Sequence, residues 1–158
     1  MMIDIHSFTT ETSPGVFHCN SWGLTLDSSI IEALTAEAKD NQNNRARICM
    51  HPAIEDLEQQ MLIVMVNNAE DVPHMHLHKR EALIPIVGTA EYQTFDDRGN
   101  SLERLLMGTD AAQYVSSPLG VYHRVVLKTP VFAFWEFALG PFTSESTIPA
   151  PWANDIGQ

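Results

Sequence analysis

The chain has 158 residues, the size of about one domain, and 44% of them are hydrophobic, which is typical of a globular protein and excludes a disordered chain. Its 20 acidic and 9 basic residues give a net charge of −11. Nucleic-acid binding relies on clustered Lys and Arg, and an anionic membrane surface would repel so acidic a chain. We therefore expect neither a nucleic acid nor a membrane as a partner.

Cysteine usage and the first residues bear on the cellular compartment. No basic segment followed by an apolar run stands at the start of the sequence, so no secretory signal is expected. The two cysteines, Cys19 and Cys49, are too few for a disulfide framework and suit a reducing cytosol as free thiols. We expect a cytoplasmic protein, with a single Cys19–Cys49 disulfide as the alternative.

Residues 1–44 are expected to form an N-terminal arm that contains a short strand at 16–18 and one helix at 28–40. Ser29 and Glu32 have the spacing of a capping box at the start of this helix. Apolar residues then recur on one helical face, namely Ile30, Ile31, Leu34 and Ala38. The helix therefore has one face suited to packing on another element.

Short strands dominate the rest of the chain. The expected strands are 61–66, 81–87, 89–95, 102–107, 114–115, 122–128 and 131–137. Gly99 supplies the positive φ of a hairpin turn between the third and fourth of these strands. Regularly spaced short strands predict an all-β sandwich or small barrel over residues 45–142, with residues 143–158 as a C-terminal tail packed on it.

Histidines concentrate around one of these strands. His74 and His76 are two positions apart, so on a strand they point the same way. Glu81 begins the next strand, and the turn from Pro118 to Gly120 delivers His123 to the start of another. Three imidazoles and one carboxylate are a suitable ligand set for Fe, Mn, Co, Ni or Zn. His78 continues the alternation, and we expect it at the rim of the cavity as a ligand-binding residue.

Three further residues are candidates for binding a small molecule. Arg45 and Arg47 alternate on one strand face, where they either pair with the many acids or clamp an anion such as a carboxylate or a sugar phosphate. His51 follows the same strand, where it either satisfies backbone carbonyls or lies in the cavity near the metal.

Tyr92 and Glu136 are the candidates for catalytic acid–base chemistry. Tyr92 either donates a proton inside the cavity or forms part of the wall. Glu136 stands among four aromatic residues, so it lies either on the outer face or buried inside. If it is buried, desolvation would raise its pKa and make it a candidate base.

The two histidine segments resemble the motifs of the cupin family. Two sets of residues carry the resemblance, His74, His76, Glu81 and Gly88 for the first motif, and Pro118, Gly120 and His123 for the second. The chain departs from the pattern in having Leu127 at the final Asn of the second motif, and in lacking the glycine that opens the first. The resemblance implies a cupin double-stranded β-helix, a jelly-roll barrel, that holds one divalent metal and commonly dimerises.

A narrower resemblance, to the WbuC-type family of cupin-fold metalloproteins, covers most of residues 45–142. Its marks are the segments 45–51, 56–62, 73–74, 95–99, 122–123, 136–142 and 151–153. Phe142 stands where that family has tyrosine, and Arg80 where a second acid is common. This family is associated with bacterial surface-polysaccharide gene clusters, so the resemblance suggests a carbohydrate-like ligand and does not specify a reaction.

Three functions follow from these features. The first is a small-molecule metalloenzyme, an oxygenase, isomerase or lyase, that acts on a small anionic or carbohydrate-like substrate. The second is a non-catalytic cupin in which the metal orients a ligand for binding or sensing. The third is a metal-free cupin used in assembly, against which the complete set of ligands argues. A homodimer is expected from the resemblance and from the apolar strand at 131–137.

Overall fold

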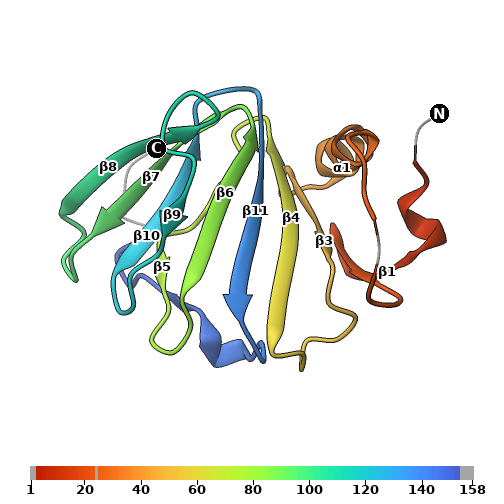
Figure 1. Cartoon of the computed structure of the whole chain (residues 1–158). Coiled ribbons are helices and arrows are strands. Elements are labelled where there is room, and N and C mark those ends of the chain that lie inside the picture. The colour runs from red at the N-terminus through yellow and green to blue at the C-terminus, as the bar shows by residue number, and fades with distance from the viewer. Residues whose placement is uncertain (1–2, 24, 154–158) are drawn as a thin grey trace.

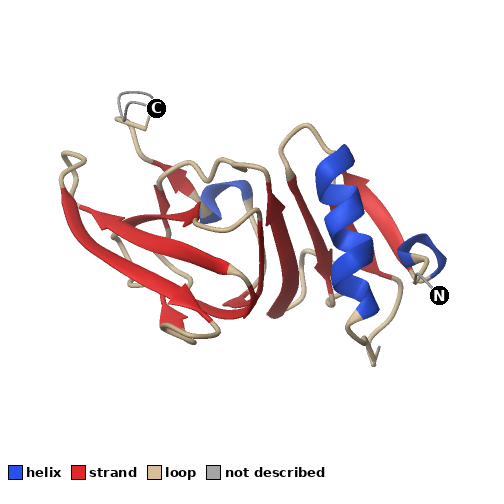
Figure 2. Cartoon of the chain, turned by 90° about the horizontal axis from the view of Figure 1, so that it is seen from above, coloured by secondary structure: helices blue, strands red, loops and turns tan. Residues whose placement is uncertain are grey.

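The computed structural model describes residues 3–23 and 25–153, and two facing β-sheets make up most of them (Figures 1 and 2). The larger sheet has the strand order β1 (Thr9–Ser13), β2 (Val16–Cys19), β3 (Arg45–Cys49), β4 (Glu58–Val66), β11 (Val131–Leu139), β6 (Glu81–Val87) and β9 (Val115–Ser116). The smaller sheet has the order β12 (Ile148–Pro149), β5 (His74–Met75), β10 (Tyr122–Leu127), β7 (Thr89–Phe95) and β8 (Ser101–Gly108).

Neighbouring strands pair antiparallel, except that β2 runs parallel to β3. After β4 the chain moves between the two sheets, as in a jelly roll. The expected all-β double-stranded β-helix with an N-terminal helical arm is therefore confirmed, although the two sheets stay separate and do not close into one continuous barrel. The boundaries expected at 44/45 and 142/143 stay predictions, and residues 154–158 of the expected tail lie outside the described residues.

The single long helix, α1 (Ser29–Asp40), packs on β3 and β4 (Figure 2). The expected capping box is wrong, because Asp27 supplies the cap: its Oδ1 accepts hydrogen bonds from the backbone N of Ser29 at 2.9 Å and from the Ser29 hydroxyl at 2.6 Å. A carboxylate at this place also opposes the partial positive charge of the helix start. Two short 3₁₀ turns, Ile5–Ser7 and Ser144–Ser146, complete the helical elements of the described residues.

Strand β4 is buried on both faces, which explains its continuous apolar sequence. Leu62, Val64 and Val66 belong to the core beneath α1. Met61, Ile63 and Met65 belong to a second core, between the two sheets. Strand β3 follows the same alternation but is polar on one side, since Arg45 and Arg47 line the space between the sheets while Ala46 and Ile48 are buried under the helix.

The strands β6 and β7 have the expected bounds, and β5 is the short strand on which His74 was expected, whereas β1 and β12 were not expected. The sequence of β1 is polar and most of it is exposed, so it has no alternation to reveal it. No helix among the described residues is long and apolar enough to cross a membrane.

Candidate metal centre

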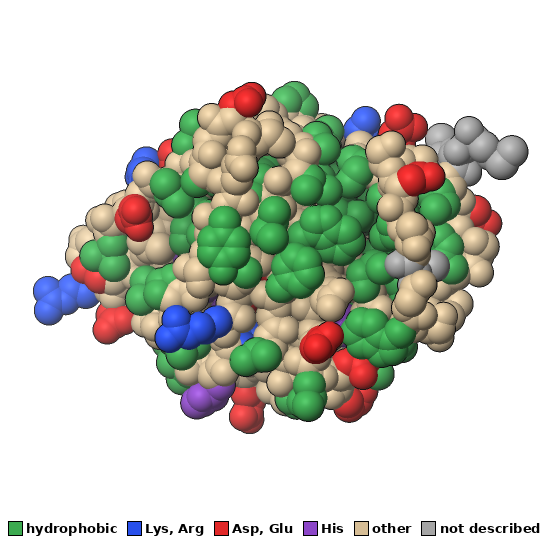
Figure 3. All heavy atoms as spheres, in the orientation of Figure 1, with side chains coloured by type: hydrophobic (Ala, Val, Ile, Leu, Met, Phe, Trp, Pro, Cys, Tyr) green, Lys and Arg blue, Asp and Glu red, His purple; other side chains and the backbone are tan. Residues whose placement is uncertain are grey.

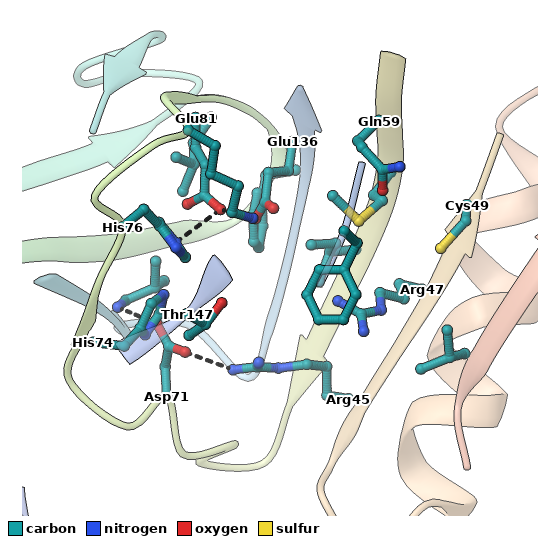
Figure 4. A pocket seen from close by; sticks show the side chains of 18 of the residues that line it. Arg45, Arg47, Cys49, Gln59, Asp71, His74, His76, Glu81, Glu136 and Thr147 are labelled. Atoms are coloured by element: carbon teal, nitrogen blue, oxygen red, sulfur yellow. Dashed lines mark hydrogen bonds and ion pairs between the residues drawn. The ribbon is translucent and has the colours of Figure 1, made fainter. Parts of the chain in front are cut away.

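Four side chains, the expected ligands His74, His76, Glu81 and His123, meet between the two sheets. His74 on β5 lies directly opposite His123 on β10, and Glu81 is the first residue of β6. Each of the four offers one ligand atom that lies within 4.8 Å of the others. Figure 4 shows His74, His76 and Glu81 converging on one end of the pocket.

Backbone carbonyls orient all three imidazoles. Nδ1 of His74 donates to the carbonyl of Val72 at 2.8 Å, and Nδ1 of His123 donates to that of Val121 at 3.0 Å. Nδ1 of His76 donates to the carbonyl of Ser146 at 2.6 Å. A carbonyl can only accept a hydrogen bond, so each Nδ1 carries a proton and each Nε2 can present its lone pair to a metal.

The Nε2 atoms of His76 and His123 are buried and have no hydrogen-bond partner in the described part of the chain. They nevertheless lie 2.9 Å and 3.7 Å from the two carboxylate oxygens of Glu81. Adjacent ligands of a metal at about 2.1 Å would themselves be roughly 3–3.5 Å apart. Leaving buried polar atoms unpaired costs free energy, and a cation bound between them would remove that cost. The four residues therefore fit a divalent transition metal.

The charges around Glu81 favour its own ionised form, which is the form that binds a metal. Burial would lower the pKa of His123, but the Glu81 carboxylate outweighs burial and raises it. Burial alone would raise the pKa of Glu81, but His123, His76 and Lys79 together hold it well below its usual range. Burial lowers the pKa of His74, which favours its neutral form. Lys79, whose Nζ lies 2.7 Å from Oε1 of Glu81, was not foreseen from the sequence. It fixes one oxygen of the carboxylate.

Two segments far along the chain hold the first histidine strand in place. Gly120 adopts a φ of 69°, which favours glycine, and its N–H donates to the carbonyl of His76 at 2.9 Å. Strand β12 pairs with β5, and the carbonyl of Ser146 just before it orients His76. The turn of the second motif and the C-terminal tail therefore both position His76, a candidate ligand of the first motif.

A cavity of about 570 Å³ extends from the four side chains along β3, β4 and β11. Among the expected binding residues, Arg45, Arg47 and His51 line it, and so does Glu136. His78 is exposed and lies outside the cavity lining, because the chain turns away after His76. The cavity thus joins the candidate metal centre to the polar side of β3.

Residues 26–107 match the family described as Domain of unknown function (DUF6016). The chain belongs to the DUF6016 family. No curated protein matches the sequence.

Solved structures place this DUF6016 protein in the cupin fold. It is similar to the capsular polysaccharide assembling protein CapF from Staphylococcus aureus, with a TM-score of 0.55 and 14% identity over 66% of this chain and 29% of that one. It is also similar to oxalate decarboxylase from Bacillus subtilis, with a TM-score of 0.51 and 20% identity over 66% of this chain and 27% of that one. The DUF6016 chain therefore spans less than a third of either protein's length, and identities this low establish the fold alone.

Glu136 lies in the cavity wall of the DUF6016 protein, on β11 (Figure 4). Burial, reinforced by the negative charge of Glu81, raises its pKa to about 7. At neutral pH this carboxyl can therefore hold or release a proton in the cavity that the candidate metal centre opens into.

Tyr92 has a different environment. Its ring stacks on that of His123, with centroids 5.6 Å apart, and its hydroxyl donates to Ser117 at 2.9 Å. Burial raises its pKa. Tyr92 of this DUF6016 protein therefore lies behind the ring of His123, a candidate metal ligand. It is not among the described residues that line the cavity, so it supports the position of His123.

The two arginines of β3 also differ. Arg45 forms an ion pair with Asp71 at 3.2 Å, and Asp71 in turn accepts a hydrogen bond from the backbone of Val125. Arg47 is in none of the ion pairs among the described residues, and its buried Nε has no hydrogen-bond partner there. The strand alternation in the sequence predicts the same role for Arg45 and Arg47. Only the folded structure shows that Arg45 has an acidic partner and that Arg47 has none in the described part of the chain.

A second group of ligand-type side chains, His18, Cys49 and His51, lies at the far end of the cavity from β6. The backbone N of Gln60 donates to Nδ1 of His51 at 3.1 Å, so a neutral His51 carries its proton on Nε2. Burial raises the pKa of the Cys49 thiol to about 11. Nε2 of neutral His51 and the thiol of Cys49 therefore both carry a proton, whereas a metal ligand must present a lone pair.

Proposed function

We propose that this cupin-fold protein binds one divalent transition metal through His74, His76, Glu81 and His123. The observation that carries the proposal is the pair of buried Nε2 atoms without partners, which lie on either side of the Glu81 carboxylate. Iron, manganese, cobalt, nickel and zinc all suit this mixed nitrogen and oxygen ligand set. The resemblance to WbuC-type metalloproteins supports the same assignment.

The bound metal would act as a Lewis acid that polarises an oxygen of the substrate. The residues of the chain supply the rest. Lys79 holds the Glu81 carboxylate in place, and the carbonyls of Val72, Val121 and Ser146 fix the imidazole rings. Glu136 stands in the cavity wall and accepts or donates a proton near neutral pH. We propose that this arrangement serves a small-molecule metalloenzyme.

The substrate class follows from the cavity. Its volume, about 570 Å³, falls in the range of sites for small organic molecules. Arg47 and His51 supply hydrogen-bond donors, which suit an anionic or hydroxyl-rich molecule. The WbuC-type resemblance supports a carbohydrate-like substrate.

One observation favours the second candidate, a metal-dependent binding or sensing protein without catalysis. A large part of the cavity wall is apolar, formed by Met61, Ile63, Met65, Leu83 and Phe134. With the Tyr92 hydroxyl bonded to Ser117, Glu136 is the only expected acid–base group that lines the cavity among the described residues. Loss of turnover in Glu136→Gln with unchanged ligand affinity would favour the enzyme over this candidate.

The first experiment is elemental analysis of untagged protein purified without added metal or chelator. We expect about one equivalent of a single transition metal, and at least a tenfold loss of metal in His76→Ala. His78→Ala is the matched control, because His78 is an exposed histidine two residues away. Equal metal content in both variants, or no uptake of metal by the parent protein, would refute the proposed site.

Two further proposals concern the setting of the protein. Cys19 and Cys49 are both buried and free, which supports a reducing, cytoplasmic compartment. Apolar side chains gather over β6 and β11 on the face of the molecule that Figure 3 shows. Trp135 and Phe137 lie on the side of β11 opposite the cavity-lining Phe134. This surface supports a homodimer, which sedimentation of the parent protein and Phe137→Lys would test.

A further inference from the structure

The strands of the larger sheet place polar side chains at the end of the cavity farthest from β6. In register, Arg47 on β3 pairs with Ile63 on β4, and Ile63 with Phe134 on β11. In the next cavity-facing row, His18, Cys49, Met61 and Glu136 follow one another across β2, β3, β4 and β11. Strand β3 lies three strand spacings, roughly 14 Å, from β6, the strand that begins with Glu81.

This end of the cavity presents hydrogen-bond donors. Arg47 has a buried Nε without a partner and pairs with no acid among the described residues. Figure 4 shows its side chain extending from β3 into the pocket, with no dashed line to an acid, whereas Arg45 is joined to Asp71. The neutral ring of His51 carries its proton on Nε2, because Gln60 occupies Nδ1.

The same cavity also presents a hydrogen-bond acceptor, on Gln59. Nε2 of Gln59 donates to the carbonyls of Ile54 and Asp56, so its Oε1 remains for a ligand in the cavity it lines (Figure 4). A half-buried guanidinium whose buried Nε has no partner suits an anion, and one amide oxygen in the same cavity suits a hydroxyl group. The chemistry is that of a hydroxylated anion.

We propose that Arg47 binds the anionic group, a carboxylate or a phosphate, of a hydroxylated small molecule whose other end reaches the metal. This assignment rests on the proposed function, and it makes the substrate a molecule several carbon atoms long rather than a two-carbon acid. Arg45 has the separate part of holding Asp71 and the Asp71-bound backbone of β10.

The test is calorimetric titration of the protein loaded with one equivalent of Mn²⁺. Three six-carbon probes are compared: sorbitol is neutral, gluconate replaces its C1 hydroxymethyl group by a carboxylate, and sorbitol 6-phosphate carries a phosphate on its C6 hydroxyl. We expect at least one anion to bind about tenfold or more tightly than sorbitol, because a buried charged hydrogen bond is worth at least that factor. The tighter anion identifies the group.

Variants assign the effect to one arginine. Arg47→Gln should weaken binding of the preferred anion about tenfold and leave sorbitol unchanged, while Arg47→Lys, which keeps the charge, should lose less. Arg45→Gln is the matched control on the same strand and should keep the preference for the anion. If Arg47→Gln does not fold, Arg47→Lys takes its place and should weaken binding of the preferred anion while it leaves sorbitol unchanged.

Other outcomes overturn the proposal. Anions that bind no more tightly than sorbitol, or no binding of any probe, would exclude an anion subsite. An equal loss in Arg45→Gln and Arg47→Gln would show that Arg47 has no special part. Elemental analysis of each sample keeps the two proposals distinct, because Arg47-dependent anion binding in a protein that takes up no metal would support the subsite and refute the metal centre.

Discussion

Nε2 of His76 lies 2.9 Å from Oε1 of Glu81, yet it makes no hydrogen bond within the described residues. The two atoms are close in distance but are not aligned as donor and acceptor. This is expected when an imidazole and a carboxylate are both directed at a third point. The Nδ1–H of the same ring is already used by the Ser146 carbonyl, which leaves Nε2 to bind a metal.

Acid should release the metal, because protons compete for the imidazole lone pairs. Burial lowers the pKa of His74, so that ring stays available below its usual range. We expect the metal content to fall mainly between about pH 7 and pH 5, around and below the ordinary histidine pKa. Equilibrium dialysis followed by elemental analysis measures this. Full metal occupancy at pH 4, or loss already at pH 8, would contradict histidine ligation.

Glu136→Gln should stabilise the metal-free protein at pH 8. The folded pKa of Glu136 is about 7 and the ordinary value is 4.5, so the folded state binds this proton more tightly. Its contribution is complete below pH 4.5 and is lost as the pH rises through 7. The variant avoids that loss, which is roughly 1–3 kcal/mol.

Urea denaturation of both proteins, in chelator, at pH 4.5 and pH 8 provides the comparison. We expect the variant to exceed the parent protein at pH 8 and to match it at pH 4.5. An equal difference in stability at the two pH values would mean that Glu136 ionises normally in the folded state.

Removal of residues 143–158 should weaken metal binding about tenfold or more. The truncation deletes the Ser146 carbonyl that orients His76 and the strand β12 that pairs with β5. Removal of residues 154–158 alone is the control. Metal titration with circular dichroism on each protein separates a loss of affinity from a loss of fold, and unchanged affinity in the longer truncation would show that the tail has no part in the centre.

Both thiols should resist modification in the folded protein. Cys19 and Cys49 are buried, and burial raises the pKa of Cys49 to about 11. We expect reaction with a thiol reagent at pH 8 to be about a hundredfold slower than in urea, since the thiolate is the reactive form. A fast-reacting thiol in native buffer would show that at least one of the two cysteines lies in an open environment.

The parts of the site that were predictable from the sequence are local. His74 and His76 share one side because the strand period is two, and a turn ending in Gly120 leads into the strand of His123. The partner of Arg45, by contrast, is Asp71, which follows β4 in the chain and contributes no periodic signal. The support of His76 by Ser146 spans 70 positions. Such contacts depend on the path of the whole chain, which one sequence does not encode as a pattern.

The two faces of β4 have a consequence for folding. A slip of one residue exchanges the faces of a strand, and polarity normally forbids it because polar groups would become buried. Strand β4 offers little such protection, since Met61–Val66 is apolar on both sides. Its neighbour β3 does offer it, because a slip there would bury Arg45 and Arg47 beneath the helix and expose Ile48 to the cavity. The arginines of β3 therefore help to fix which face of the larger sheet lines the cavity.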